Sequence, residues 1–233
     1  MKRSGSAPGS AAPQCGNNPH RGWYSRGYLP HLDASHLIQF ITYRLADSLP
    51  ATVHERLKAE VASRGLAENR RRAELRQQID RYLDAGQGSC VLRIPAIAAC
   101  IEDTWQHFDG ERYRLLEWVV MPNHCHVLIE AFQGIPLGKI VLSWKNYTAR
   151  FINDYLSRTG VRRSQIKRSQ VWQRDYWDRF IRDERHFEAT KHYIAMNPVK
   201  AGLVDTPEAW PWSSAARKVD NATPGSTAPQ CGS

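Results

Sequence analysis

Two histidines separated by one cysteine, His124 and His126, are the residues in this sequence best suited to chemistry. On a β-strand, side chains two positions apart point to the same face, so the two imidazoles would project side by side. Adjacent imidazole nitrogens can bind one divalent metal, whereas two buried histidines without partners would leave polar nitrogens unsatisfied. Cys125 would point the other way with Val127 and Ile129, so we interpret it as a packing residue. A His-x-His pair alone is more often structural, and a metal site needs further support.

A tyrosine and an asparagine near the end of the chain supply the second polar group. Tyr193 and Asn197 are four residues apart in a predicted helix, so their side chains share one face. A phenol with a pKa near 10 is a poor nucleophile, but a metal that polarises a phosphate lowers the barrier to its attack. We expect Pro198 to end the helix, which would leave Asn197 at or just past the last turn. Tyr176 is the runner-up nucleophile, although only the apolar Phe180 follows it four residues later.

The elements that must position these residues follow from hydrophobic periodicity. Alternation predicts strands, and apolar residues three or four apart predict helices. The turn dipeptide Pro122-Asn123 joins two strands as an antiparallel hairpin. Asp183 is a candidate cap for the last helix. The strands are predicted at 36–44, 113–121 and 124–131, with a short piece at 171–172, and the helices over 51–83 (two helices or one bent helix), from 95 to before 110, over 137–156 and from 183 to 198.

This order of elements predicts an α+β fold in which helices cover an antiparallel, ferredoxin-like sheet. The helix over 137–156 is strongly amphipathic. We expect Ile140, Trp144, Tyr147 and Phe151 to face inward, and Lys139, Lys145 and Arg150 to remain available to phosphate. Arg70, Arg71 and Arg72 are interpreted as a solvated helix face.

Composition limits the function classes. The 233 residues fit one domain, predicted over 31–216 between disordered tails at 1–30 and 217–233 that are rich in Ala, Pro, Gly and Ser. The N-terminus has no apolar signal segment, so we expect a cytoplasmic protein. Five cysteines without a CxxC pair argue against a disulfide framework or a zinc ribbon. No apolar run is long enough to span a bilayer.

The net charge of +9 favours a nucleic acid as partner, because neutralised phosphates release condensed counterions. Single-stranded nucleic acid is bound by cations along its backbone and by aromatic rings that stack on bases. Both kinds of residue interleave in the second half of the chain. The candidate cations are Lys145, Arg150, Arg162, Arg163, Lys167, Arg168, Arg174, Arg179 and Lys200, and the candidate aromatic residues are Trp144, Trp172, Tyr176 and Trp177.

Four segments of the sequence carry a family resemblance. They are EWVVMPNHCHVLI at 117–129, SWKNYTAR at 143–150, VWQRDYWDRFIRD at 171–183 and YIAMNPVKAGL at 193–203. In this order they resemble the REP-associated tyrosine transposases, which belong to the single-tyrosine HUH transposases. The resemblance covers roughly residues 30–215, and Trp210-Pro-Trp-Ser-Ser214 looks like the family's closing segment.

The resemblance implies an enzyme that recognises a hairpin in single-stranded DNA and cuts beside it through a 5′-phosphotyrosine intermediate. His124 and His126 match the metal-binding histidines, Tyr193 the nucleophile and Asn197 the third ligand, for which many relatives use Gln. The metal would be Mg²⁺ or Mn²⁺, and the protein a monomer or a homodimer. Cys125 departs from the bulky hydrophobic residue that the family places between the histidines. The rival interpretations are a domesticated protein that binds hairpin DNA or RNA without cutting it, and a structural metal domain.

Overall fold

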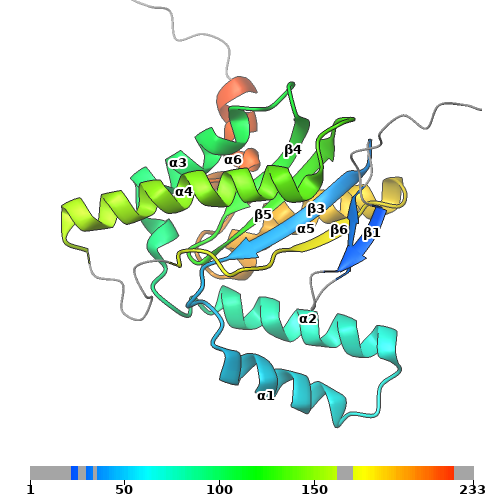
Figure 1. Ribbon diagram of the computed structural model, residues 1–233. Helices are drawn as coiled ribbons and strands as arrows, with labels where there is room; N and C mark the ends of the chain where they lie inside the picture. Colours follow the sequence, from blue (N-terminus) through cyan, green and yellow to red (C-terminus); the bar gives the residue numbers. More distant parts are fainter. Residues whose placement is uncertain (1–21, 26–29, 34–35, 162–169, 223–233) are drawn as a thin grey trace, which may run out of the picture.

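A computed structural model describes residues 22–25, 30–33, 36–161 and 170–222 (Figure 1). Its centre is a four-stranded antiparallel sheet with the strand order β4-β5-β3-β6. The strands are β3 (Ile38–Arg44), β4 (Tyr113–Val120), β5 (His124–Ala131) and β6 (Trp177–Phe180).

Two helices complete the ferredoxin-like core. Helix α3 (Pro95–Gln106) connects β3 to β4, and α4 (Leu137–Thr159) connects β5 to β6. The resulting βαββαβ order, with the first and third strands of the unit in the middle of the sheet, is the split βαβ arrangement. The predicted α+β, ferredoxin-like fold is therefore confirmed, as is the antiparallel β4–β5 hairpin around Pro122-Asn123.

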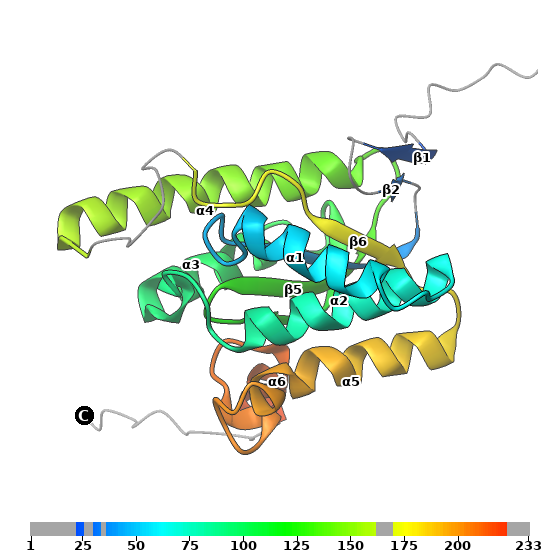
Figure 2. The ribbon, with the colours of Figure 1, turned by 90° about the horizontal axis from the view of Figure 1, so that it is seen from below.

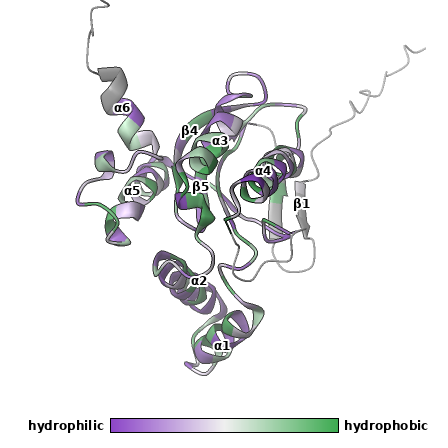
Figure 3. Cartoon of the chain, turned by 90° about the vertical axis from the view of Figure 1, so that its left-hand side faces the viewer, coloured by the Kyte–Doolittle hydropathy of each residue, from purple (hydrophilic) through white to green (hydrophobic). Residues whose placement is uncertain are grey.

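Buried side chains form a core on each face of the sheet, and alternate residues of β5 belong to one core or the other. Figure 3 shows α3 and α4 on one side of the sheet and α5 on the other. Cys125, Val127 and Ile129 are fully buried in the core beneath α3 and α4. Leu128 packs on the opposite side with Ile194 of α5 (Glu184–Lys200). His124 and His126 therefore lie on the α5 face, because side chains alternate along a strand.

A helical hairpin, α1 (Ala51–Ala62) and α2 (Glu68–Asp84), is inserted between β3 and α3 (Figures 1 and 2). It has a small core of its own around Leu57 and Leu83. The chain returns close to where it left the sheet. Gly88 has a φ of +92°, and a Cβ there would lie 2.9 Å from the Asp47 carbonyl oxygen, so this crossing requires glycine. Arg70, Arg71 and Arg72 are exposed, as predicted.

The remaining elements lie around this core. Helix η1 (Val91–Arg93) precedes α3, and η2 (Pro207–Ala209) and α6 (Ser214–Ala222) follow α5. The backbone N–H of Val120 donates to the Trp212 carbonyl at 2.8 Å, which holds the last segment against β4. Within the described ranges, no helix has both the length and the apolar character needed to cross a membrane.

Three details differ from the sequence predictions. Trp172 forms only an isolated bridge with Leu45, and the fourth strand begins at Trp177. Helix α5 continues through Pro198 to Lys200. Pro198 cannot donate a helix hydrogen bond, but its own carbonyl accepts from Leu203 at 2.9 Å and that of Val199 accepts from Gly202 at 2.9 Å, which closes the last turn. The carbonyl of Asn197 accepts from Ala201 at 3.0 Å, and Asn197 is helical. Asp183 caps α5 as predicted, accepting from the His186 backbone N–H at 2.7 Å.

The hairpin of β1 (Gly22–Ser25) and β2 (Pro30–Asp33) was not predicted, and β1 lies within the expected N-terminal tail. Most of that tail, the end of the C-terminal tail and the basic loop with Arg162, Arg163, Lys167 and Arg168 lie outside the described residues. The predicted division at 31–216 stays a prediction.

Candidate active site on the α5 face of the sheet

The two histidines of β5 meet through their Nε2 atoms. These atoms are 3.1 Å apart, and both side chains are 1% exposed. Burial and nearby guanidinium groups lower the pKa of both imidazoles, that of His124 to about 3. Near neutral pH both rings are therefore uncharged, which is the state that binds a metal ion.

Asn123 fixes the tautomer of His124. The Asn123 amide nitrogen donates to the carbonyls of Leu83 at 3.0 Å and Gln87 at 2.8 Å, which turns its oxygen toward the imidazole. His124 Nδ1 lies 2.7 Å from that oxygen and must donate to it. The Nε2 atom of His124 is consequently left with a lone pair. Sequence reasoning interpreted Asn123 only as a turn residue.

His126 is held from the neighbouring strand. Its Nδ1 lies 2.8 Å from the Thr42 hydroxyl, its cross-strand partner on β3. When His126 donates to Thr42, both Nε2 lone pairs converge on one point, a geometry that a cation stabilises.

The tyrosine of α5 lies beside this pair. The ring centroids of Tyr193 and His126 are 5.4 Å apart, and Phe40 packs edge-on against Tyr193 at 5.8 Å. Asn197 follows one turn later, almost completely buried, and its Oδ1 atom has no hydrogen-bond partner among the described residues. The structure thus brings together the four residues singled out from the sequence, which come from β5 and α5.

A third element, α2, also contributes to the site, and the sequence reasoning missed it. The Tyr193 hydroxyl donates to Asp80 Oδ2 at 3.2 Å, and Asp84 Oδ1 lies 4.0 Å from His124 Nε2. Burial raises the pKa of Asp84 to about 6, and burial with the nearby carboxylates raises that of Tyr193. The available signal was the spacing of Arg76, Asp80 and Asp84, which places three charges on one face of a helix that otherwise needs apolar contacts.

A partly buried cation lies next to the carboxylates. Arg44 is paired across the sheet with His124, and burial lowers the pKa of its guanidinium to about 10, an effect that the charge of Asp80 opposes. Its Nε is buried without a hydrogen-bond partner in the described part of the chain. A guanidinium with an unused N–H donor can bind an anion such as a phosphate.

The residues fit a small divalent cation. No group of three or more His, Cys, Asp or Glu side chains that could hold a metal occurs in the described ranges. The set defined here differs in kind, because its third donor is an amide oxygen. Two Nε2 atoms 3.1 Å apart and the unpartnered Asn197 Oδ1 on the adjoining helix supply borderline and hard donors.

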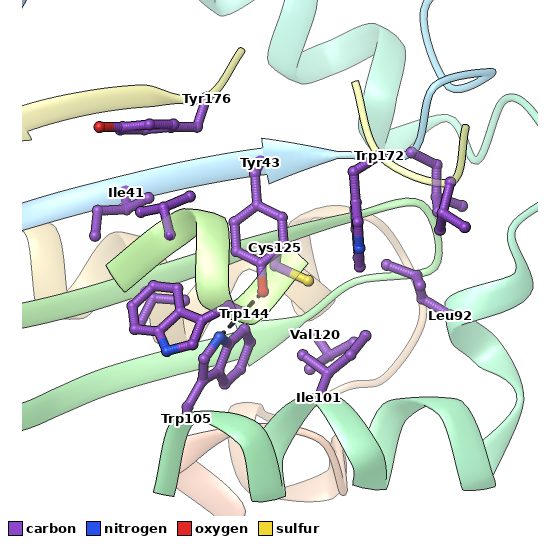
Figure 4. Close-up of a cluster of buried hydrophobic side chains, with 14 of the residues drawn as sticks. Ile41, Tyr43, Leu92, Ile101, Trp105, Val120, Cys125, Trp144, Trp172 and Tyr176 are labelled. Atoms are coloured by element: carbon purple, nitrogen blue, oxygen red, sulfur yellow. Dashed lines mark hydrogen bonds between the residues drawn. The ribbon is translucent and has the colours of Figure 1, made fainter. Parts of the chain in front are cut away.

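Several residues predicted to contact DNA have structural roles instead. Lys145 is buried, and its Nζ donates to the carbonyls of Gln173 at 2.6 Å and Arg174 at 2.9 Å, so it holds a loop and is not available to phosphate. Trp144, Trp172 and Tyr176 belong to the core beneath α3 and α4, so they cannot stack on bases (Figure 4).

The structure tests three further expectations about the positions of single side chains. Tyr176 is 4% exposed on the face opposite the histidines, which removes it as the alternative nucleophile. Cys125 lies in this core as expected (Figure 4). Tyr147, expected to face inward, is 60% exposed.

Four of the predicted cations are exposed, and they come from different elements. Arg150, Arg174, Arg179 and Lys200 are exposed. The Lys200 ammonium lies 5.0 Å from the centre of the Tyr193 ring, so one predicted contact adjoins the candidate nucleophile directly. Trp177 is partly buried, with the Arg76 guanidinium 3.1 Å from its ring centre.

The chain combines a ferredoxin-like domain with paired histidines that face a helical tyrosine. A comparison with known protein families agrees with the transposase class that the sequence motifs predicted. The family model described as transposase IS200 like matches residues 96–197, a range that contains both histidines, Tyr193 and Asn197. The matched family is one of transposases, which are DNA-processing enzymes.

A solved structure adds to this result. It is described as a REP-associated tyrosine transposase bound to a REP hairpin, and it shares this fold with a TM-score of 0.50 and 15% identity over 89% of this chain and 97% of that chain. No curated protein matches the chain. The family match and the shared fold agree with the resemblance to tyrosine transposases that the four sequence motifs predicted.

Proposed function

We propose that this chain is a metal-dependent endonuclease and strand transferase that cuts single-stranded DNA beside a hairpin. The observation that carries the proposal is the position of the Tyr193 ring, 5.4 Å from the His126 ring on the face where both imidazoles converge. A tyrosine with only a packing role would not need a carboxylate on its hydroxyl and two neutral imidazoles beside it. The REP hairpin bound by the structurally similar protein supports the hairpin as substrate.

In the proposed reaction, the Tyr193 oxygen attacks a DNA phosphate. A bond forms between this oxygen and phosphorus, and the bond from phosphorus to the 3′-oxygen breaks, leaving a 5′-phosphotyrosine and a 3′-hydroxyl. Because the ester bond is conserved in the intermediate, a second 3′-hydroxyl can reverse the attack and join strands. The Phe40 contact limits the movement of the phenol, which favours a reactive orientation.

His124, His126 and Asn197 would hold Mg²⁺ or Mn²⁺. When bound, the metal supplies positive charge to a phosphate and stabilises the charge that develops during attack. The hydrogen bonds from Asn123 and Thr42 orient the two imidazoles for this role.

Exposed cations on three segments would bind the DNA backbone. Arg150, Arg174 and Lys200 stay in the proposed DNA-binding set, together with the loop residues Arg162, Arg163, Lys167 and Arg168. The net charge of +9 supports this set, and binding should weaken steeply with salt. The predicted cytoplasmic location stays a prediction.

The test is covalent capture. The full chain is incubated with Mn²⁺ and a labelled single-stranded oligonucleotide that carries a hairpin from the flanks of the gene. We expect an adduct that survives denaturation, disappears in Tyr193→Phe and persists in the matched control Tyr176→Phe. Hairpin binding without any adduct would support the non-cleaving alternative and overturn the enzymatic proposal.

A further inference from the structure

The carboxylate that meets the candidate nucleophile comes from outside the βαββαβ core. Asp80 lies on α2, and its Oδ2 accepts the Tyr193 hydroxyl proton at 3.2 Å across 113 residues of sequence. The Asp80 side chain is 19% exposed, so water competes little for this hydrogen bond. A partly buried carboxylate on the hydroxyl of a candidate nucleophile has the geometry of a proton acceptor.

The surroundings of Asp80 keep its carboxylate in place. Arg76, one turn earlier, approaches Oδ2 to 3.6 Å with its Nε. The same guanidinium covers the Trp177 ring at 3.1 Å, which connects α2 to the edge strand β6. Asp80 is therefore supported by a cation that is itself held by packing.

The charged and titratable groups that face Asp80 come from three elements. Burial raises its pKa, and the surrounding cations and the hydrogen bond from the phenol oppose this effect. These groups are Arg76 and Asp84 on α2, Arg44 on β3, and Tyr193 and Lys200 on α5.

We propose that Asp80 is a catalytic residue of this site, which orients the Tyr193 hydroxyl and accepts its proton as the oxygen attacks phosphorus. This inference rests on the proposed function. The phenol proton moves to Asp80 Oδ2 as the bond from the tyrosine oxygen to phosphorus forms. The 3′-oxygen departs with its electron pair and takes one proton from water, and Asp80 later returns one proton to water. The inserted helical hairpin thereby contributes directly to the chemistry of the sheet.

Two substitutions of Asp80 can separate its role in orienting the Tyr193 hydroxyl from its role as a base. Asparagine at this position can still accept the phenol hydrogen bond through its amide oxygen, but it is a far weaker base. Asp80→Asn therefore separates proton acceptance from orientation, and Asp80→Glu returns a carboxylate at a shifted position. Glu60→Gln removes an exposed carboxylate from α1 and is the matched control.

The experiment measures three quantities on the full chain. These are the single-turnover rate of Tyr193 adduct formation with Mn²⁺, the affinity for the hairpin oligonucleotide in EDTA, and the affinity for Mn²⁺ alone. We expect Asp80→Asn to slow adduct formation about 100-fold or more while both affinities stay within about twofold. Asp80→Glu should recover at least part of the rate, and Glu60→Gln should behave as wild type.

Different outcomes overturn different statements. An adduct rate in Asp80→Asn close to that of wild type would refute the role of Asp80 and leave the proposed function intact. A parallel fall of rate and of either affinity would assign Asp80 a structural role and also refute the inference. If Asp80→Asn does not fold, Asp80→Ala is measured in its place, and an adduct rate in Asp80→Ala close to that of wild type refutes the inference. A wild-type chain that forms no adduct would overturn both.

Discussion

Asn123 connects the metal-binding candidates to the inserted hairpin, and removing its amide should affect both. In Asn123→Ala, His124 Nδ1 loses its acceptor at 2.7 Å, and the carbonyls of Leu83 and Gln87 lose their donor. Removing such an orienting hydrogen bond typically lowers metal affinity 10- to 100-fold, which is about 1.4–2.7 kcal/mol. Leaving the buried Leu83 carbonyl without its donor should cost roughly 1–3 kcal/mol in unfolding free energy. Gln87 is exposed, so water can replace the donor that its carbonyl loses.

The assay compares Mn²⁺ affinity, measured by electron paramagnetic resonance, with urea unfolding of the same variants. Leu156→Ala is the matched control because this buried residue of α4 lies in the core on the opposite side of the sheet. It should lose about 2–5 kcal/mol of stability without loss of Mn²⁺ affinity. Wild-type Mn²⁺ affinity in Asn123→Ala would refute the orienting role, and an equal loss in Leu156→Ala would attribute the effect to global destabilisation.

Three further predictions concern charged groups, two of them in the candidate site and one, Lys145, outside it. Asp84→Asn should raise the free energy of unfolding at pH 7.5 by up to about 3 kcal/mol, because the folded pKa of about 6 lies above the unfolded value of 3.8; the gain should vanish in urea titrations near pH 4. Arg44→Gln should weaken hairpin binding and reduce the salt slope by about 0.7–0.9, as measured by fluorescence anisotropy, and an unchanged slope would exclude a phosphate contact. Lys145→Met should lower the melting temperature yet leave that slope unchanged, since its ammonium binds two backbone carbonyls.

The strands of the sheet, and the face on which each candidate site residue lies, could be predicted because the sequence signals for both are local. Alternation fixes which face each residue of β5 occupies, so the separation of Cys125 from His124 and His126 followed from position alone. The one-turn spacing of Tyr193 and Asn197 likewise survived, since Pro198 follows both residues and the carbonyls of the final turn of α5 are satisfied by the N–H groups of the next residues.

What stayed hidden depends on contacts between distant segments. Asp80 and Asp84 resemble ordinary polar residues of an amphipathic helix until α2 is placed beside α5. Lys145 failed as a DNA contact because the loop at Gln173 and Arg174 presents two carbonyls to its ammonium, a demand for hydrogen bonding that no periodicity reveals. Trp172 and Tyr176 were misjudged for a related reason, since a cation-rich neighbourhood in sequence says little about which face of the sheet an aromatic ring covers.

The crossing at Gly88 has a consequence for how such proteins are compared. Since the excursion through α1 and α2 leaves and rejoins the sheet at nearly one point, deleting it would preserve the strand order and every crossover connection. The same deletion would strip Arg76, Asp80 and Asp84 from the reactive face and free Asn123 from its two anchors. Two chains with identical topology could thus differ in their ability to catalyse the reaction. A structural comparison that considers only the sheet would not distinguish them.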